Sequence, residues 1–103
     1  MQDKVLSLLS LATKAGKTVS GEFMTENEIK SEKAKLVIIA SDCSDNTKKK
    51  FEDMCAYRNI KIVHYANKED LGKYIGKEFR ACVAVLDEGF ASSILKQLGN
   101  FND

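Results

Sequence analysis

The chain has 103 residues, of which 44% are hydrophobic and 30% are charged, and its formal net charge is +1. This balance is typical of a soluble globular protein, and no apolar run approaches the roughly 20 residues that cross a bilayer, so we expect residues 1–103 to form a single domain that does not bind membranes. A nearly neutral charge excludes a broadly basic surface, so any attraction to nucleic acid must come from a local patch.

The first predicted element is an amphipathic helix over about residues 3–14, with a stop at Gly16. Apolar side chains recur there at helical spacing, at Val5, Leu8, Leu9 and Ala12. The early charge of Asp3 argues against a signal peptide and favours a cytoplasmic protein. A short strand is predicted over residues 17–20 and a polar helix over residues 22–31.

Three apolar runs later in the chain predict strands that alternate with helices. These strands cover residues 36–40, 60–65 and 82–86. The helix after each strand is expected to begin at a capping side chain: Ser44, Asn67 and Asp87. The alternation predicts an α/β fold with βαβ units, a largely parallel sheet and helices on both faces. Function is then expected beyond the carboxyl ends of the strands, where three segments would meet: residues 41–46, 66–68 and 87–89.

Three consecutive lysines, Lys48 to Lys50, lie in the predicted helix after the second strand. They would suit a phosphate-binding patch. They would equally suit a solvated helix face, because Lys48 can pair with Glu52 and Lys49 with Asp53 at i,i+4 spacing, for about 0.2–0.5 kcal/mol each. The spacing alone favours the solvated face.

The thiols give no sign of a metal site or a disulfide framework. Cys43, Cys55 and Cys82 are widely spaced and form no C-x-x-C pair. Reduced thiols are therefore expected, with no bound metal and no cofactor.

The residues also argue against an enzyme. Cys43 lies near a predicted helix start, where a thiol can be activated, but the interpretation as an ordinary small residue is favoured. His64 is the only histidine, and no nucleophile is tied to it in the sequence. Asp45 and Asp87 already serve helix starts, and no glycine loop of the G-x-x-x-x-G-K type is present.

The segment over residues 21–27 has two interpretations. Gly21 would allow another backbone to come close, and the N–H groups of the helix that follows would attract phosphate. Alternatively, it is a tight strand-to-helix turn, with Phe23 and Met24 in the core. Spacing alone favours the turn.

Four segments in order resemble the ribosomal protein family of kink-turn RNA binders of the L7Ae type, and within it the small bacterial YlxQ-type branch. They are residues 11–22, 33–60, 71–81 and 83–91. The resemblance implies a three-layer α/β/α sandwich with a mixed four-stranded sheet. It also implies a non-catalytic, monomeric protein whose partner is a structured RNA, either ribosomal or containing a kink-turn, and which can associate with the ribosome.

The resemblance also implies where RNA would bind. In the family, the N-terminal end of the second helix enters the widened major groove of a kinked RNA, and a loop before the last strand packs against a flipped-out base. The corresponding segments here are residues 21–27 and 77–81, and Asp42 matches a family aspartate beside the RNA. The residues expected to contact RNA are Lys17, Gly21, Glu22, Phe23, Met24, Asn27, Asp42, Lys73, Phe79, Arg80 and Ala81.

The chain departs from the family pattern at the positions that read bases. Archaeal-type members have Asn, Glu and Lys where this chain has Phe23, Met24 and Asn27, and a basic pair where it has Val19 and Ser20. Each lost bidentate contact removes about 1–3 kcal/mol of base discrimination. The sequence therefore leaves a second possibility open, a protein-interaction module of the same fold with weakened RNA binding.

Overall fold

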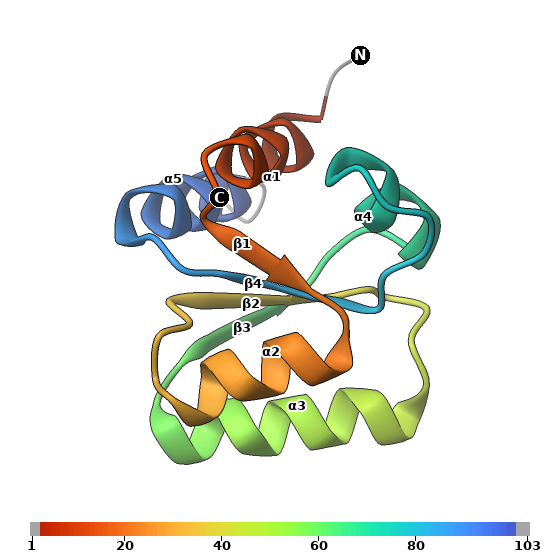
Figure 1. Ribbon diagram of the computed structural model, residues 1–103, viewed down its shortest axis with the longest axis vertical. Helices are drawn as coiled ribbons and strands as arrows, with labels where there is room; N and C mark the ends of the chain where they lie inside the picture. The colour runs from red at the N-terminus through yellow and green to blue at the C-terminus, as the bar shows by residue number, and fades with distance from the viewer. Residues whose placement is uncertain (1–2, 101–103) are drawn as a thin grey trace.

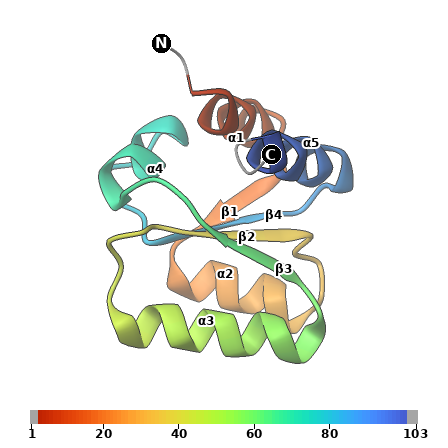
Figure 2. The same cartoon turned by 180° about the vertical axis from the view of Figure 1, so that it is seen from behind.

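The computed structural model describes residues 3–100, which form five helices and four strands (Figure 1). In chain order these are α1 (Lys4–Lys14), β1 (Thr18–Ser20), α2 (Glu22–Lys30), β2 (Leu36–Ile39), α3 (Asp45–Arg58), β3 (Lys61–His64), α4 (Lys68–Tyr74), β4 (Cys82–Val85) and α5 (Glu88–Asn100). Helices α1, α4 and α5 cover one face of the sheet, and α2 and α3 cover the other (Figures 1 and 2). The predicted three-layer α/β/α sandwich is therefore confirmed.

The sheet is mixed, with the strand order β1-β4-β2-β3. Strands β2 and β3 are parallel, whereas β4 runs antiparallel to both of its neighbours, β1 and β2. The mixed sheet implied by the family resemblance is confirmed, and the largely parallel sheet predicted from the alternation of strands and helices is wrong. The reason lies in the connection from β3 to β4, which does not cross to the other end of the sheet. Instead, the N–H of Arg80 donates to the carbonyl of Lys68 at 3.1 Å, so this connection ends where it began.

This topology changes which segments meet at the edge of the sheet where function was expected. Residues 41–46 and 66–68 do meet, because the N–H of Ser41 donates to the carbonyl of Ala66 at 2.7 Å. Residues 87–89 lie at the opposite end of the sheet, since the N–H of Lys35, just before β2, bonds the carbonyl of Val85 at 2.8 Å. Instead of residues 87–89, the loop over residues 77–81 lies beside the first two segments.

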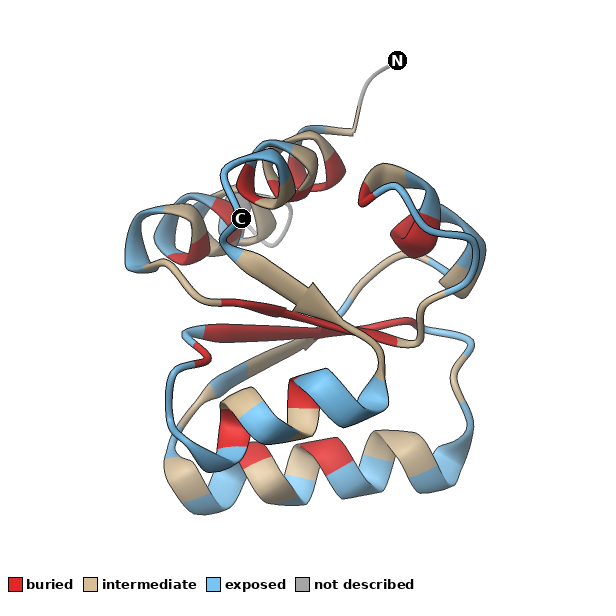
Figure 3. Cartoon of the chain, viewed as in Figure 1, coloured by how far each residue is buried: buried red, intermediate tan, exposed pale blue. Residues whose placement is uncertain are grey.

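Two hydrophobic clusters hold the layers together, one on each face of the sheet (Figure 3). Side chains of β2 alternate between them: Leu36 and Ile38 pack towards α1, α4 and α5, whereas Val37 and Ile39 pack towards α2 and α3. Every residue of β2 and β4 is buried, as expected for the two central strands. Phe51 on α3 has no exposed surface and is the largest fully buried side chain. No helix within residues 3–100 combines the length and apolar character needed to span a membrane.

A hydrogen bond between two segments that are distant in the chain is expected to make the stability of the fold decrease at alkaline pH. The hydroxyl of Tyr65, after β3, donates to Asp3 Oδ2 at 2.7 Å, and Asp3 Oδ1 accepts from the N–H of Leu6 to cap α1. Burial and the neighbouring Asp3 raise the pKa of Tyr65 from 10.0 to about 12. Because the folded protein holds this proton more tightly than the unfolded chain, the stabilisation is complete below pH 10 and is lost as the pH rises towards 12.

We therefore expect the free energy of unfolding, measured with urea, to fall by about 1–2 kcal/mol through Tyr65 between these pH values. The variant Tyr65→Phe should lose less stability than the wild type over the same range. The buried thiols of Cys55 and Cys82 titrate in the same direction in both proteins, so the difference between the curves isolates Tyr65. Parallel curves for the two proteins would contradict this prediction.

Candidate nucleic-acid interface

The N-terminal end of α2 is open to solvent. Gly21 precedes the helix with φ +89° and ψ 158°, a conformation that side chains rarely adopt, and its N–H donates to the carbonyl of Cys82 at 3.0 Å. The first bond of the helix runs from the N–H of Thr25 to the carbonyl of Gly21. The N–H groups of residues 22–24 consequently have no partner within the helix, and Gly21 offers no capping side chain. Residues 22–24 are all exposed, so this end of the helix is accessible to solvent.

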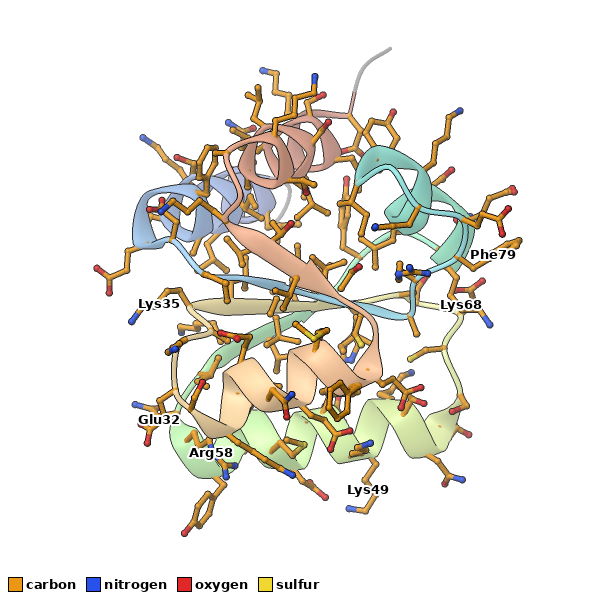
Figure 4. All side chains as sticks on the ribbon, viewed as in Figure 1. Glu32, Lys35, Lys49, Arg58, Lys68 and Phe79 are labelled. Atoms are coloured by element: carbon orange, nitrogen blue, oxygen red, sulfur yellow. The ribbon has the colours of Figure 1, made fainter. Side chains whose placement is uncertain are left out.

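The loop over residues 77–81 is fixed beside this helix end by Arg80. Its Nε donates to Oγ of Ser20 at 3.1 Å, and its backbone N–H bonds the carbonyl of Lys68. Its Nη1 also donates to the carbonyl of Phe79 at 2.8 Å, which holds the guanidinium against its own loop. The Phe79 side chain is 63% exposed and projects from the loop (Figure 4).

A cleft of about 380 Å³ lies along β1, between the end of α1 and the segment after α4, and it reaches the start of α2 at Met24. Met24 and Ser20 line one side of it, and Lys77 and Arg80 bring two cationic side chains to it. Lys77 begins the 77–81 loop that the family resemblance placed against RNA, although it was not named among the individual contact residues. Its position at the cleft follows from the way the loop returns to β4.

One face of α2 carries exposed side chains next to the cleft. Phe23 is 73% exposed and Met24 44%, so the prediction that they belong to the core is wrong. The helix instead packs through Thr25 and Ile29, neither of which has exposed surface. Asn27 is exposed and lies one turn after Phe23 and Met24, on the same face of the helix.

Asp42 and Ala81 lie where β2 ends. Asp42 Oδ1 accepts from the N–H of Lys68 at 2.9 Å, so this carboxylate ties the loop after β2 to the start of α4. The carbonyl of Ala81 accepts from the N–H of Ala40 at 2.8 Å and so ends the 77–81 loop beside the same strand. Asp42 thus has a structural partner as well as an exposed position.

Two of the expected contact residues do not line the cleft. Lys17 is exposed at the opposite end of β1 from Gly21, where its carbonyl accepts from the N–H of Leu86 at 2.8 Å. Lys73 is exposed in the last turn of α4 and does not line the cleft. The structure therefore brings together the start of α2 and the 77–81 loop, but not these two lysines.

Of the two ion pairs predicted within α3, one is present. Lys49 Nζ lies 3.2 Å from Asp53 Oδ2, and both side chains are well exposed. Figure 4 shows Lys49 projecting from the surface of the molecule. The predicted pair between Lys48 and Glu52 is wrong, because Glu52 Oε2 instead lies 3.2 Å from Nε2 of His64 on β3. The contact between Glu52 and His64 could not be predicted from the sequence, since it depends on α3 packing against β3.

The third lysine of the run turns towards α2. Lys50 Nζ lies 2.7 Å from Glu26 Oε2 and 3.7 Å from Glu22 Oε1. The hydrogen bond to Glu26 is the main reason why the pKa of Lys50 is raised. The lysine run is therefore not a continuous phosphate-binding patch.

The thiols do not form a reactive site. All three cysteines are free, and burial raises the pKa of Cys43 above its ordinary value and that of Cys55 and Cys82 to about 11. The raised pKa disfavours the thiolate of Cys43, so the structure gives no support to the interpretation of Cys43 as an activated thiol. Within residues 3–100, no three His, Cys, Asp or Glu side chains are grouped so that they could hold a metal ion.

Comparison with known proteins identifies the family. Residues 3–95 match the model of the ribosomal protein L7Ae/L30e/S12e/Gadd45 family. The chain belongs to this family. Among its L7Ae-family relatives, the RNA-binding protein YlxQ of Bacillus subtilis is 44% identical over 91 residues, which are 88% of this chain and 91% of that protein. The predicted family and its YlxQ-type branch are therefore confirmed.

Two solved structures extend the L7Ae-family comparison. A protein of unknown function from Bacillus halodurans superimposes with a TM-score of 0.89 at 35% identity, covering 92% of this chain and 96% of that one. The Giardia lamblia 15.5kD RNA binding protein gives a TM-score of 0.79 at 17% identity, covering 97% and 89%. The second likeness shows that the fold is shared despite low sequence identity.

Proposed function

We propose that this L7Ae-family protein is a non-catalytic RNA-binding protein that recognises structured, kinked RNA. The RNA would contact the N-terminal end of α2 and the 77–81 loop. The observation that carries the proposal is the exposed start of α2, whose first N–H groups lack partners in the helix and adjoin a cleft lined by Lys77 and Arg80. The name of the Bacillus subtilis relative supports it. We further propose a cytoplasmic monomer whose partner is a ribosomal or kink-turn RNA.

The geometry suits a sharply bent phosphate backbone. A phosphate at the start of α2 would accept hydrogen bonds from the free N–H groups and would lie at the positive end of the helix dipole. Nothing lies within 4 Å of the place where a Cβ on Gly21 would stand, so a backbone can approach closely. Lys77 and Arg80 would add an attraction that weakens as salt concentration rises.

Aromatic and apolar side chains at the edge of the cleft suit unpaired bases. Phe79 is 63% exposed on a loop that Arg80 fixes in place, so its ring is available for stacking. Phe23 and Met24 can add contact area, but neither carries the donors and acceptors needed to read a base edge. Recognition is therefore expected to depend on RNA shape more than on base sequence.

A binding titration tests the proposal. The protein should bind an RNA containing a kink-turn at least several-fold more tightly than a straight duplex of equal length, because only the bent backbone can reach the helix end and the loop together. Affinity for both RNAs should fall with salt. Equal, weak binding to the two RNAs would contradict kink recognition.

The exposed pair Phe23 and Met24 favours a second candidate function, that of a protein-interaction module of the same fold. Neighbouring exposed apolar side chains of this kind can form part of a docking surface. Under this alternative, partners captured from a lysate would remain bound after ribonuclease treatment and would be lost from a Phe23→Ser variant. Under the RNA-binding proposal, ribonuclease would release them.

A further inference from the structure

Lys50 links two neighbouring helices at the proposed RNA site. Its amine reaches from α3 to two carboxylates of α2, lying 2.7 Å from Glu26 Oε2 and 3.7 Å from Glu22 Oε1. Glu22 and Glu26 are one turn apart and therefore share a face of α2. The two helices lie side by side beneath the sheet in both views (Figures 1 and 2).

The position of Glu22 makes this contact relevant to anion binding. Glu22 is the first residue of α2, so it puts a negative charge in the same first turn whose free N–H groups a phosphate would use. A carboxylate there is attracted to the helix start and repels an incoming phosphate. Glu26 adds a second negative charge one turn further on. Without a cation between them, these two carboxylates would oppose RNA binding.

We propose that Lys50 is a positioning residue for RNA binding, which neutralises Glu22 and Glu26 and draws their carboxylates away from the helix start. This inference rests on the proposed function. Lys50 acts through the carboxylates, because its amine is directed to Glu26 at hydrogen-bond distance. The pair with Glu22 contributes little to stability, since the side chains of Lys50 and Glu22 are 41% and 49% exposed.

Lys49 provides a matched control on the same helix. It is the adjacent residue, it carries the same charge, and it pairs with Asp53 of α3 at 3.2 Å rather than with α2. Replacing either lysine with alanine changes the net charge of the protein equally. A difference in RNA affinity between Lys49→Ala and Lys50→Ala therefore reports the local effect on α2.

The test is a titration of these variants against a kink-turn RNA. We expect Lys50→Ala to weaken binding about fivefold and Lys49→Ala less than about twofold. The double variant Lys50→Ala with Glu26→Gln, which has the net charge of the wild type, should restore affinity to within about twofold, and so should Lys50→Arg alone. Melting temperatures should stay within about 3 °C of the wild type.

The salt dependence separates this role from a direct phosphate contact. If Lys50 bound a phosphate itself, Lys50→Ala would reduce the slope of log affinity against log salt by about one, and Glu26→Gln would not rescue it. Either result, or equal losses for the two lysines, would overturn the inference while leaving the proposed function intact. A wild-type protein that binds no RNA would instead overturn the proposed function, and this inference with it.

Discussion

Replacing Gly72 with alanine is expected to destabilise the protein by about 2–4 kcal/mol and to displace the loop over residues 77–81. A Cβ added at Gly72 would overlap the carbonyl oxygen of Glu78 and would lie 2.6 Å from its carbonyl carbon and 3.1 Å from the nitrogen of Phe79. These are backbone atoms, so no side-chain rotation relieves the clash. The N–H of Lys77 also donates to the carbonyl of Gly72 at 2.8 Å, which presses the loop onto the helix.

Unfolding in urea measures this effect, and Gly99→Ala is its control. Gly99 lies in α5 with nothing within 4 Å of the added methyl group, so that variant should be neutral or slightly more stable through helix propensity. Gly72→Ala should also bind RNA more weakly at temperatures where it remains folded, because the loop carries Phe79 and Arg80. Unfolding free energies that agree within about 0.5 kcal/mol for the two variants would contradict the prediction.

Features that depend on neighbouring residues in the chain were predictable. Ser44 Oγ accepts from the N–H of Thr47 at 3.1 Å, and Asn67 and Asp87 each cap the helix that follows them, as predicted. Each cap is a contact over three residues, so the sequence contains the whole of it. The direction of β4 could not be predicted in this way, because it depends on the loop after α4 folding back to Lys68. Only the family resemblance implied the mixed sheet.

The location of the candidate interface could be predicted from the sequence better than the side chains that form it. Gly21 and the 77–81 loop do come together at one end of the sheet. The orientation of α2 was misjudged, because the buried face of this short, polar helix is marked by Thr25 and Ile29 rather than by its aromatic residue. Lys50 was assigned to a solvated run, since a bond to Glu26 on another helix leaves no trace in i,i+4 spacing. Contacts between helices decide both features.

Replacing Gly21 with aspartate is expected to lower affinity for a kinked RNA at least about tenfold. The new carboxylate would stand at the start of α2, where it would both repel the phosphate backbone and compete for the free N–H groups. Fold stability should also fall by about 1–3 kcal/mol, because Gly21 has φ +89° and a side chain there is strained even though the space is open. RNA titration and thermal unfolding measure the two effects separately.

The variant Gly21→Ala separates charge from strain at this position. It imposes the same backbone strain as Gly21→Asp but adds only a methyl group, which meets nothing within 4 Å in the protein. If the start of α2 binds phosphate, Gly21→Ala should retain most of the affinity at temperatures where it is folded, and the aspartate variant should not. The difference in RNA affinity between the two variants should decrease at high salt, since screening weakens the repulsion. Equal affinities at low salt would mean that phosphate binds elsewhere, and the role assigned to the helix end would be lost.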